Sequence, residues 1–514
     1  MSRPITLICL LLVPAFGVHA QDHASAAAHH QRGMALYRAQ DPDGGIREIT
    51  QAVELDPHYA EAWNDLGVMQ RQRGHLAAAI GSFRRAVAEK PEFSSAVYNL
   101  ALALEASGDS AGAIEQIQRV LTLAPRLPQG HAVYGRLLAN KNRLEASRQE
   151  LRRALELDSS LVTARIDLGA VLIKLGFISD ALRELQQAVQ QDPKSAQAHF
   201  QLGLALFQHG TPQEAKAEFV RAVELAPGMV EARINLGQLE QQENRMPEAI
   251  AQYRAAVQAA PGDVGAALHL AQALVQTQAQ AEAKSVLEAA IHRHPRNAAL
   301  HCELGKVLAS LGKRDAALRE LKLATTTDAK SAVYLVELGR VLHDAGRIAE
   351  QREALEKAVE VDPHSVEARY ALAALARQSG DTTSSREQLA KVRQLRQADV
   401  NRDLALGEIR AGVVLAGKHE YAAAIEKFQH AIAINPQLGE AHFDLAGALF
   451  EKGDTAAAIS SFRQAIQIAP QWAEAHYQLG RALVRAGQRN EAIKEFRAAL
   501  KYDPAHTGAR AALQ

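Results

Sequence analysis

The stretch AEAWNDLGVMQRQRGHLAAAIGSFRRAVAEKPEF, residues 60–93, carries the folding pattern of this chain in 34 residues. Apolar or small residues stand at positions 4, 7, 8 and 11 of the stretch and again at positions 20, 24 and 27. Both sets have helical spacing. Gly74 separates the two sets, and Pro91 follows the second. The stretch therefore predicts two amphipathic helices joined by a tight turn.

The same pattern recurs along almost the whole sequence, for example in residues 473–506. Prolines stand at 57, 91, 125, 193, 227, 261, 295 and 363, and the series resumes at 436, 470 and 504. Within each series every gap is 34 or 68 residues. Aligned on these prolines, the chain contains fourteen repeats, which start at residues 26, 60, 94, 128, 162, 196, 230, 264, 298, 332, 366, 405, 439 and 473.

Position 8 of the repeat is always a small residue, Gly in ten repeats and Ala in four. A glycine inside a helix costs about 1 kcal/mol relative to alanine, so its recurrence needs a structural reason. Position 20 is Ala in ten repeats, and position 24 often carries a bulky residue such as Phe83 or Phe219. We infer that the second helix approaches the first closely at position 8.

This pattern closely resembles the tetratricopeptide repeat (TPR), whose signature is W-x2-L-G-x2-Y, then A-x3-F, then P over 34 residues. Trp63, Gly67, Ala79, Phe83 and Pro91 carry the resemblance in the stretch quoted above. The resemblance implies an all-α fold, a right-handed superhelical TPR solenoid of about 14 helix-turn-helix repeats.

Ser159, Ala329 and Gln397 replace the terminal proline, and one repeat, 366–399, departs from the pattern throughout. Ser385 stands at its position 20, and five extra residues, Val400 to Leu404, follow it. We interpret this segment as a longer charged helix that joins two blocks of repeats. The predicted organisation is a signal peptide at 1–20, a block of ten repeats at 26–365, a degenerate repeat and helical linker or hinge at 366–404, three repeats at 405–506 and a C-terminal capping helix at 507–514.

The first twenty residues have the features of a secretory signal peptide. They contain Arg3, an apolar core from about Ile5 to Phe16, and small-residue spacing that ends at Ala20. We predict cleavage after Ala20 and export to a periplasm or to the cell exterior. The alternative is a short buried N-terminal helix. No later apolar stretch reaches 18 residues, so no membrane insertion is predicted after cleavage.

The charge balance bears on the class of partner. The chain has 58 Lys and Arg against 58 Asp and Glu, a formal net charge of zero. Proteins that bind nucleic acid owe much of their affinity to clustered basic residues that neutralise phosphates. The sequence therefore argues against a nucleic-acid partner.

Two short motifs with catalytic associations are better explained by the repeat. Residues 108–112 have the form G-x-S-x-G, but a nucleophile elbow needs a strand before it, and this segment is an inter-helix turn. His419 and Glu420 begin an H-E-x-x-H motif, but Ala423 stands where the second histidine would be. We predict no catalytic residue.

His292, His294, His301 and Cys302 lie close enough in sequence to gather a metal. However, position 4 is histidine in six repeats, which gives His301 a role in packing instead. We predict no metal and no cofactor.

Proteins that resemble this chain bind partners on the concave surface of their first helices, chiefly through positions 2, 5, 6, 9, 12 and 13. The resemblance implies that aromatic and amide side chains there contact a protein or an extended peptide, with pockets for alternate side chains. The alternative is that these residues only pack neighbouring repeats. The candidate partner-binding residues are Tyr98, Asn99, Phe200, Gln201, Phe207, Asn235, Tyr370, Phe443, Phe450 and Tyr477.

The leading hypothesis is a non-enzymatic protein-interaction scaffold that serves the assembly of an extracytoplasmic complex. The alternative is a targeting module that resembles the TPR region of O-linked N-acetylglucosamine transferases, without a catalytic domain of its own. A carbohydrate-binding surface is disfavoured, because the two tryptophans, Trp63 and Trp472, are far apart on the repeat lattice.

Overall fold

The computed structural model describes residues 16–503 and 506–513. In this part of the chain the backbone forms 28 α-helices and no β-strand. Successive helices pack as hairpins, one hairpin for each predicted repeat. The all-α repeat fold predicted from the sequence is therefore confirmed.

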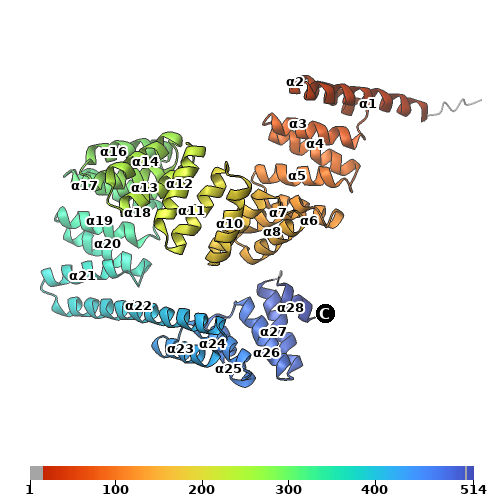
Figure 1. The fold of residues 1–514 in the computed structure, drawn as a ribbon. Helices are drawn as coiled ribbons and strands as arrows, with labels where there is room; N and C mark the ends of the chain where they lie inside the picture. The colour runs from red at the N-terminus through yellow and green to blue at the C-terminus, as the bar shows by residue number, and fades with distance from the viewer. Residues whose placement is uncertain (1–15, 504–505, 514) are drawn as a thin grey trace, which may run out of the picture. The chain divides into compact units, whose positions relative to one another are not determined.

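The chain divides into two compact units, and the first comprises Met1–Pro227. In it the second helix of each repeat also packs against the first helix of the next (Figure 1). Its helices are α1 (Phe16–Arg38), α2 (Pro42–Leu55), α3 (Ala60–Gln72), α4 (Leu76–Glu89), α5 (Ser94–Ala106), α6 (Ser110–Leu123), α7 (Pro128–Asn140), α8 (Leu144–Leu157), α9 (Val162–Lys174), α10 (Ile178–Gln191), α11 (Ala196–His209) and α12 (Pro212–Leu225).

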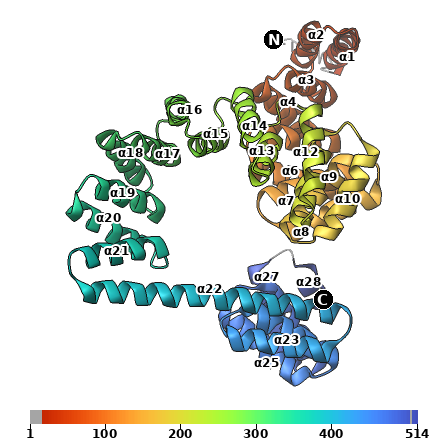
Figure 2. The same cartoon turned by 60° about the vertical axis from the view of Figure 1, so that its left-hand side comes forward.

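The second compact unit comprises Gly228–Gln514. It continues the alternation of first and second helices (Figure 2). Its helices are α13 (Val230–Gln242), α14 (Met246–Ala259), α15 (Val264–Gln276), α16 (Gln280–Arg293), α17 (Ala298–Ser310), α18 (Arg314–Thr327), α19 (Ala332–Asp344), α20 (Ile348–Val361), α21 (Val366–Gln378), α22 (Thr382–Gly417), α23 (Tyr421–Ile434), α24 (Gly439–Lys452), α25 (Thr455–Ile468), α26 (Ala473–Arg485), α27 (Arg489–Tyr502) and α28 (Thr507–Ala512).

All fourteen repeats make the same backbone turn at position 15. Nine of them place a glycine there, such as Gly74 with φ 79°, and the other five place a residue with a side chain, such as His419 with φ 63°. A positive φ ends the first helix in the left-handed conformation, which glycine adopts without strain. The residues with side chains at this position are Gln40, Asn142, Asn244, Gln278 and His419.

The glycine at position 8 marks the closest approach between the two helices of a hairpin. A Cβ atom added to Gly67 would lie 2.6 Å from Cε1 of Phe83, and one added to Gly412 would lie 2.6 Å from Cε1 of Phe428. Both phenylalanines are buried. The close approach inferred from the sequence is therefore confirmed in these repeats.

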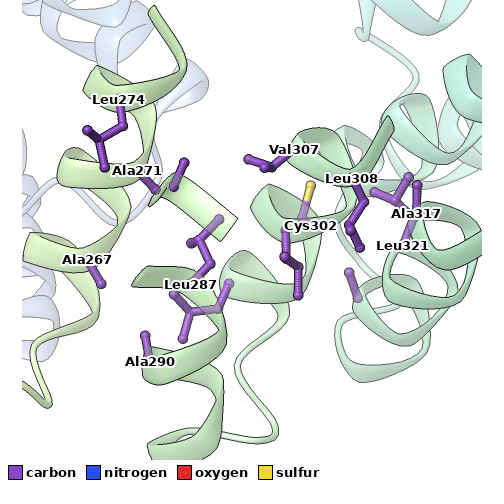
Figure 3. Packing of buried hydrophobic residues seen from close by; sticks show 14 of the residues in the cluster. Ala267, Ala271, Leu274, Leu287, Ala290, Cys302, Val307, Leu308, Ala317 and Leu321 are labelled. Atoms are coloured by element: carbon purple, nitrogen blue, oxygen red, sulfur yellow. The ribbon is translucent and has the colours of Figure 1, made fainter. Parts of the chain in front are cut away.

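The core consists of separate clusters of buried residues between neighbouring helices. Figure 3 shows one of them, in which apolar side chains of α15, α16, α17 and α18 point into the spaces between the helices. Leu287 and Leu321 are fully buried there, and Cys302 is 5% exposed. Each repeat buries its apolar face only against its neighbours, as expected for a solenoid.

The predicted linker region contains the longest helix of the described chain. Helix α22 runs for 36 residues from Thr382 to Gly417 without a break (Figures 1 and 2). It forms the second helix of the degenerate repeat, continues through the five extra residues and forms the first helix of the next repeat. Residue 404, the end of the predicted linker, lies inside it.

The chain termini are described in part. Residues 1–15 of the predicted signal peptide lie outside the described residues, and α1 begins at Phe16. At the other end α28 packs against α27, and Ala509 is fully buried. Among the described helices, none is both long enough and apolar enough to cross a membrane.

Candidate functional site

The predicted aromatic residues at position 5 lie on the first helices but contribute to the core. The ring centroid of Phe200 is 5.9 Å from that of Phe219 on its partner helix, and Phe443 and Phe462 are 5.6 Å apart. Tyr477 lies in the same relation to Phe496, at 5.9 Å. Phe200 is buried, whereas Phe443 and Tyr477 are half-buried. Packing within the repeat therefore accounts for much of the surface of these rings.

Two other predicted residues at position 5 are tyrosines. Tyr98 is half-buried, and burial raises the pKa of its hydroxyl group. Tyr370 is 40% exposed, with the Arg396 guanidinium 5.0 Å from its ring centroid. Tyr98 lies on α5 and Tyr370 lies on α21, and no other predicted aromatic residue lies on either helix.

The predicted amide side chains at position 6 already form hydrogen bonds within the chain or are half-buried. Asn99 donates from Nδ2 to Oδ1 of Asn64, at 2.9 Å, and so joins two successive first helices. Asn235 donates to the carbonyl oxygen of Glu231, at 2.8 Å. Gln201 is half-buried. Asn99 thus has a structural role, while its amide oxygen stays available to a ligand.

The structure brings two of the ten predicted residues together through a shared cation. The guanidinium of Arg481 lies 5.5 Å from the ring centroid of Phe450 and 6.0 Å from that of Tyr477. Arg485 covers the same Phe450 ring at 4.9 Å. Phe207, by contrast, is 41% exposed on α11. At this one pair of repeats, positions 5 and 9 of the later repeat therefore lie beside position 12 of the earlier one.

Two hollows lie between the first helices α15, α17, α19 and α21. One cavity of about 590 Å³ lies between α19 and α21, and another of about 570 Å³ lies between α15, α17 and α19. Arg340 lines both. None of the ten residues predicted from the sequence lines either one. The polar residues that line them are Arg340, His343, Gln351, Arg377 and Gln378 in the first, and Gln272, Gln276, Glu303, Lys306, Ser310, Arg340 and Asp344 in the second.

Small side chains create these hollows. In α21, Ala371 and Ala374 occupy positions 6 and 9, where α19 carries Glu337 and Arg340. In α17, Ala309 occupies position 12, where α19 carries His343. The missing side-chain volume leaves space between the helices. The alanines at positions 9 and 12 are visible in the sequence. A search for aromatic residues at position 5 does not consider them.

The charges of the two hollows differ. Lys306 pairs with Glu303 at 2.9 Å, and Arg340 donates from Nε to Glu337 at 3.0 Å. Burial opposes the charge of Lys306, but the hydrogen bond with Glu303 and the negative charges of Glu303 and Glu337 together raise the lysine pKa. Arg377 is exposed and forms no ion pair within the described residues. The hollow between α19 and α21 therefore contains two arginines. Arg377 is unpaired within the described residues, and Arg340 is paired with Glu337.

The sequence segments with catalytic or metal associations belong to the repeat architecture. Asp109 of the G-x-S-x-G segment accepts a hydrogen bond from the backbone N–H of Gly112 as the N-cap of α6, and no strand precedes it. Nδ1 of His301 lies 2.6 Å from Glu320, and Nε2 lies 3.1 Å from the carbonyl oxygen of Pro295.

The thiol of Cys302 is poorly suited to metal binding. Burial raises its pKa to about 12, whereas a metal binds the thiolate. In the described residues, no three or more His, Cys, Asp or Glu side chains gather in a way that could hold a metal ion.

Comparison with solved structures finds repeat proteins of low sequence identity. The APC/C hetero-tetramer Cut9-Hcn1 is 15% identical with a TM-score of 0.40, covering 97% of this chain and 98% of that one. A tetratricopeptide repeat protein from Parabacteroides merdae is 15% identical with a TM-score of 0.43, covering 49% and 99%. YrrB, described as a TPR protein with an unusual peptide-binding site, is 24% identical with a TM-score of 0.29, covering 36% and 95%. No curated protein matches the sequence.

Sequence profiles of the tetratricopeptide repeat match most of the chain. One profile matches residues 30–94, 98–161, 166–228, 209–264, 336–399 and 409–471. A second matches residues 449–514. Together with the fourteen helical hairpins, these matches show that the chain belongs to the tetratricopeptide repeat family.

Proposed function

We propose that this protein is a non-enzymatic scaffold that binds an extended segment of a partner protein on its first-helix face. The observation that carries the proposal is the pair of adjoining hollows that share Arg340. Repeats of this family typically form non-catalytic interaction surfaces. The proposed ligand is a peptide and not a nucleic acid, because the chain has no net positive charge.

The lining residues suit a peptide that carries a carboxylate. Arg377 has no ion-pair partner in the described chain, and Arg340 uses only its Nε atom on Glu337. A guanidinium binds a carboxylate through two parallel hydrogen bonds. Gln378 has no hydrogen-bond partner within the described residues and can pair with peptide backbone groups. We therefore expect an acidic side chain over α19 and α21, with the adjacent backbone along the glutamines.

Peptide selection tests this proposal. Random twelve-residue peptides displayed on phage are selected against the purified chain, and binding of the selected peptides is measured by fluorescence anisotropy. We expect enrichment of Asp or Glu and a tenfold or greater loss of affinity for Arg340→Ala and Arg377→Ala, because a charge-assisted hydrogen bond is worth about 1.5–3 kcal/mol. Arg402→Ala, an exposed arginine on α22 outside the hollows, is the matched control.

Two outcomes would contradict the proposal. One is selection of peptides without acidic residues, and the other is equal binding to the Arg340→Ala and Arg402→Ala variants. Phe207→Ser and Phe450→Ser then test whether binding uses the aromatic positions predicted from the sequence. Both rings are on the surface or half-buried, so these changes disturb the core less than a change at buried Phe200.

We propose further that the scaffold acts outside the cytoplasm, in the assembly of an extracytoplasmic complex. The support is the pattern of Arg3, the apolar core and the small residues before Ala20. N-terminal sequencing of the protein isolated from its native cells tests this. A mature N-terminus at Gln21 in the extracytoplasmic fraction is expected, and an intact N-terminus in the cytoplasm would contradict export.

A further inference from the structure

Helix α22 exposes an apolar stripe that has no packing partner in the described chain. The stripe consists of Val400, Leu404, Gly407, Ala411 and Val414, whose spacing alternates between four and three residues. This spacing places all five on one side of the helix and is the spacing of a coiled-coil seam. Val400 is 51% exposed, Leu404 56% and Val414 58%.

In other repeats the same positions are buried. Val414 stands at position 10, where Met69 and Val307 are each 1% exposed. Ala411 stands at position 7, where Leu445 is 7% exposed. Within this unit the second helix of the preceding repeat packs against such a first helix, as α14 packs against α15 and α23 against α24. Here that preceding helix is the first half of α22 itself, so it cannot fold back to cover the stripe.

The glycine in the stripe has no close neighbour within the described chain. A Cβ atom at Gly407 would meet nothing within 4 Å. A glycine inside a helix costs about 1 kcal/mol relative to alanine, and at Gly67 or Gly412 the ring of a phenylalanine explains it. At Gly407 the open space leaves room for a side chain of a second molecule.

We propose that two copies of this chain associate through α22, with the two stripes packed antiparallel about a two-fold axis near residues 405 and 406. In this arrangement Leu404 of each copy packs over Gly407 of the other, and Val400 packs over Ala411. Each layer then combines one large and one small side chain. A parallel pair would instead place glycine against glycine and leave a void, which is unfavourable.

The flanking charges favour the same arrangement. Asp403 and Arg410 border the stripe, both are exposed, and neither forms an ion pair within the described residues. Antiparallel packing brings Asp403 of one copy beside Arg410 of the other, twice over. Parallel packing would bring Asp403 near Glu408 of the second copy, where like charges repel. Size and charge therefore identify a second copy of α22 as the occupant of the stripe.

The first half of α22 is a poorer occupant. Its position 28 is Arg393, whereas the corresponding residues Val359, Ile432 and Ile466 of other repeats are apolar. An exchanged arrangement, in which residues 382–399 of one copy cover the stripe of the other, would place that arginine against apolar side chains. Symmetric pairing of the two stripes avoids this cost.

The first experiment measures self-association of the full chain by sedimentation velocity over a range of concentrations. We expect a monomer–dimer equilibrium, and self-association at least about tenfold weaker in Leu404→Glu. Val333→Glu, at an apolar residue of α19 that is 67% exposed, is the matched control and should leave the dimer unchanged. A wild-type chain that stays monomeric, or a dimer that Leu404→Glu does not weaken, would overturn the proposal.

A charge exchange tests the geometry without depending on a single variant. Asp403→Arg and Arg410→Asp should each weaken the homodimer, because each places like charges together twice. When the two variants are mixed, both ion pairs are restored, so a heterodimer should form. Absence of the heterodimer would contradict antiparallel pairing.

A distance measurement gives an independent check on direction. A spin label at Lys391→Cys, in a Cys9→Ser, Cys302→Ser background, should show an intermolecular distance of about 45 Å in the antiparallel dimer, from the helical rise of 1.5 Å per residue. A distance below about 20 Å would show parallel pairing and overturn the arrangement proposed here.

Discussion

The imidazole Nδ1 of His476 lies 2.6 Å from a carboxylate oxygen of Glu495. The other ring nitrogen, Nε2, lies 3.0 Å from the carbonyl oxygen of Pro470, in the preceding repeat. A carbonyl oxygen and an ionised carboxylate only accept hydrogen bonds, so both ring nitrogens must donate. His476 is therefore a charged link between two repeats.

The same pair of contacts recurs at position 4 along the chain. His131, His199 and His301 each bridge a glutamate of their own repeat and a proline carbonyl of the preceding one. In another repeat the position is Arg165, which donates to Glu184 and to the carbonyl oxygen of Ser159. An arginine is always charged and its guanidinium has five N–H donors, so it makes both hydrogen bonds in place of histidine here.

The first prediction concerns the pH dependence of the His476 link. The hydrogen bond with Glu495 raises the pKa of His476 above its ordinary value of 6.5. Because the folded pKa is the higher one, the stabilisation is complete below about pH 6.5 and is lost as pH rises through the folded pKa. Hydrogen exchange of α26 and α27, corrected for intrinsic rates, should therefore show less protection at alkaline pH.

The variant His476→Arg supplies the control. An arginine keeps both donors charged at every pH used, so the protection of α26 and α27 should become independent of pH in this range. An unchanged pH dependence in the variant would show that other groups cause it. Exchange is the suitable readout because it reports each repeat separately.

The second prediction concerns the close approach at position 8. In Gly67→Ala the new Cβ atom would lie 2.6 Å from the buried ring of Phe83. We expect a loss of stability of about 1–3 kcal/mol, typical of overpacking. Gly81→Ala, on the exposed side of α4 with nothing within 4 Å, should instead stabilise the helix by up to about 1 kcal/mol. Urea denaturation followed by circular dichroism compares the two, and equal effects would argue against close packing.

The third prediction concerns Asp444 on α24. Burial raises the pKa of its carboxyl group from 3.8 to about 6, and Glu440 adds to the shift. Stability associated with this group is therefore highest at low pH and falls as pH rises through this window. Asp444→Asn should raise the melting temperature at pH 7.5 and change it little at pH 4. Glu451→Gln, an exposed residue on the same helix, should have no such effect.

The fourth prediction concerns the turn at position 15. Gln278 adopts a φ of 62°, a conformation that residues with side chains seldom take. Gln278→Gly removes this strain and should stabilise the chain by up to about 1 kcal/mol. The reciprocal change, Gly312→Gln at a φ of 74°, should destabilise it by a similar amount. If both changes shift thermal stability in the same direction, the turn conformation is not the cause.

Much of the fold could be predicted from local sequence signals. The proline series defines the repeat register, and the structure places a positive φ at position 15 of every repeat, including Gln40 and His419, where no glycine marks the turn. The pairing of Gly67 with Phe83 follows from small and bulky residues at fixed positions. These features depend on contacts within one repeat, so one repeat is enough to reveal them.

The candidate site was harder to predict because it depends on several repeats at once. Phe200 is an aromatic residue at a position where a partner could bind, yet the structure buries it against Phe219. The hollows arise where Ala371 and Ala374 leave space beside the larger residues of α19. Such a space is a difference between neighbouring repeats, and a pattern averaged over all repeats conceals it.

Helix α22 also affects how the chain acquires its structure. Starting a helix is the costly step, since several residues must be ordered before the first hydrogen bond forms. Because α22 belongs to two hairpins, with α21 at one end and α23 at the other, one nucleation event serves both. We therefore expect the formation of these two hairpins to be coupled, whereas hairpins separated by a loop can form one after another.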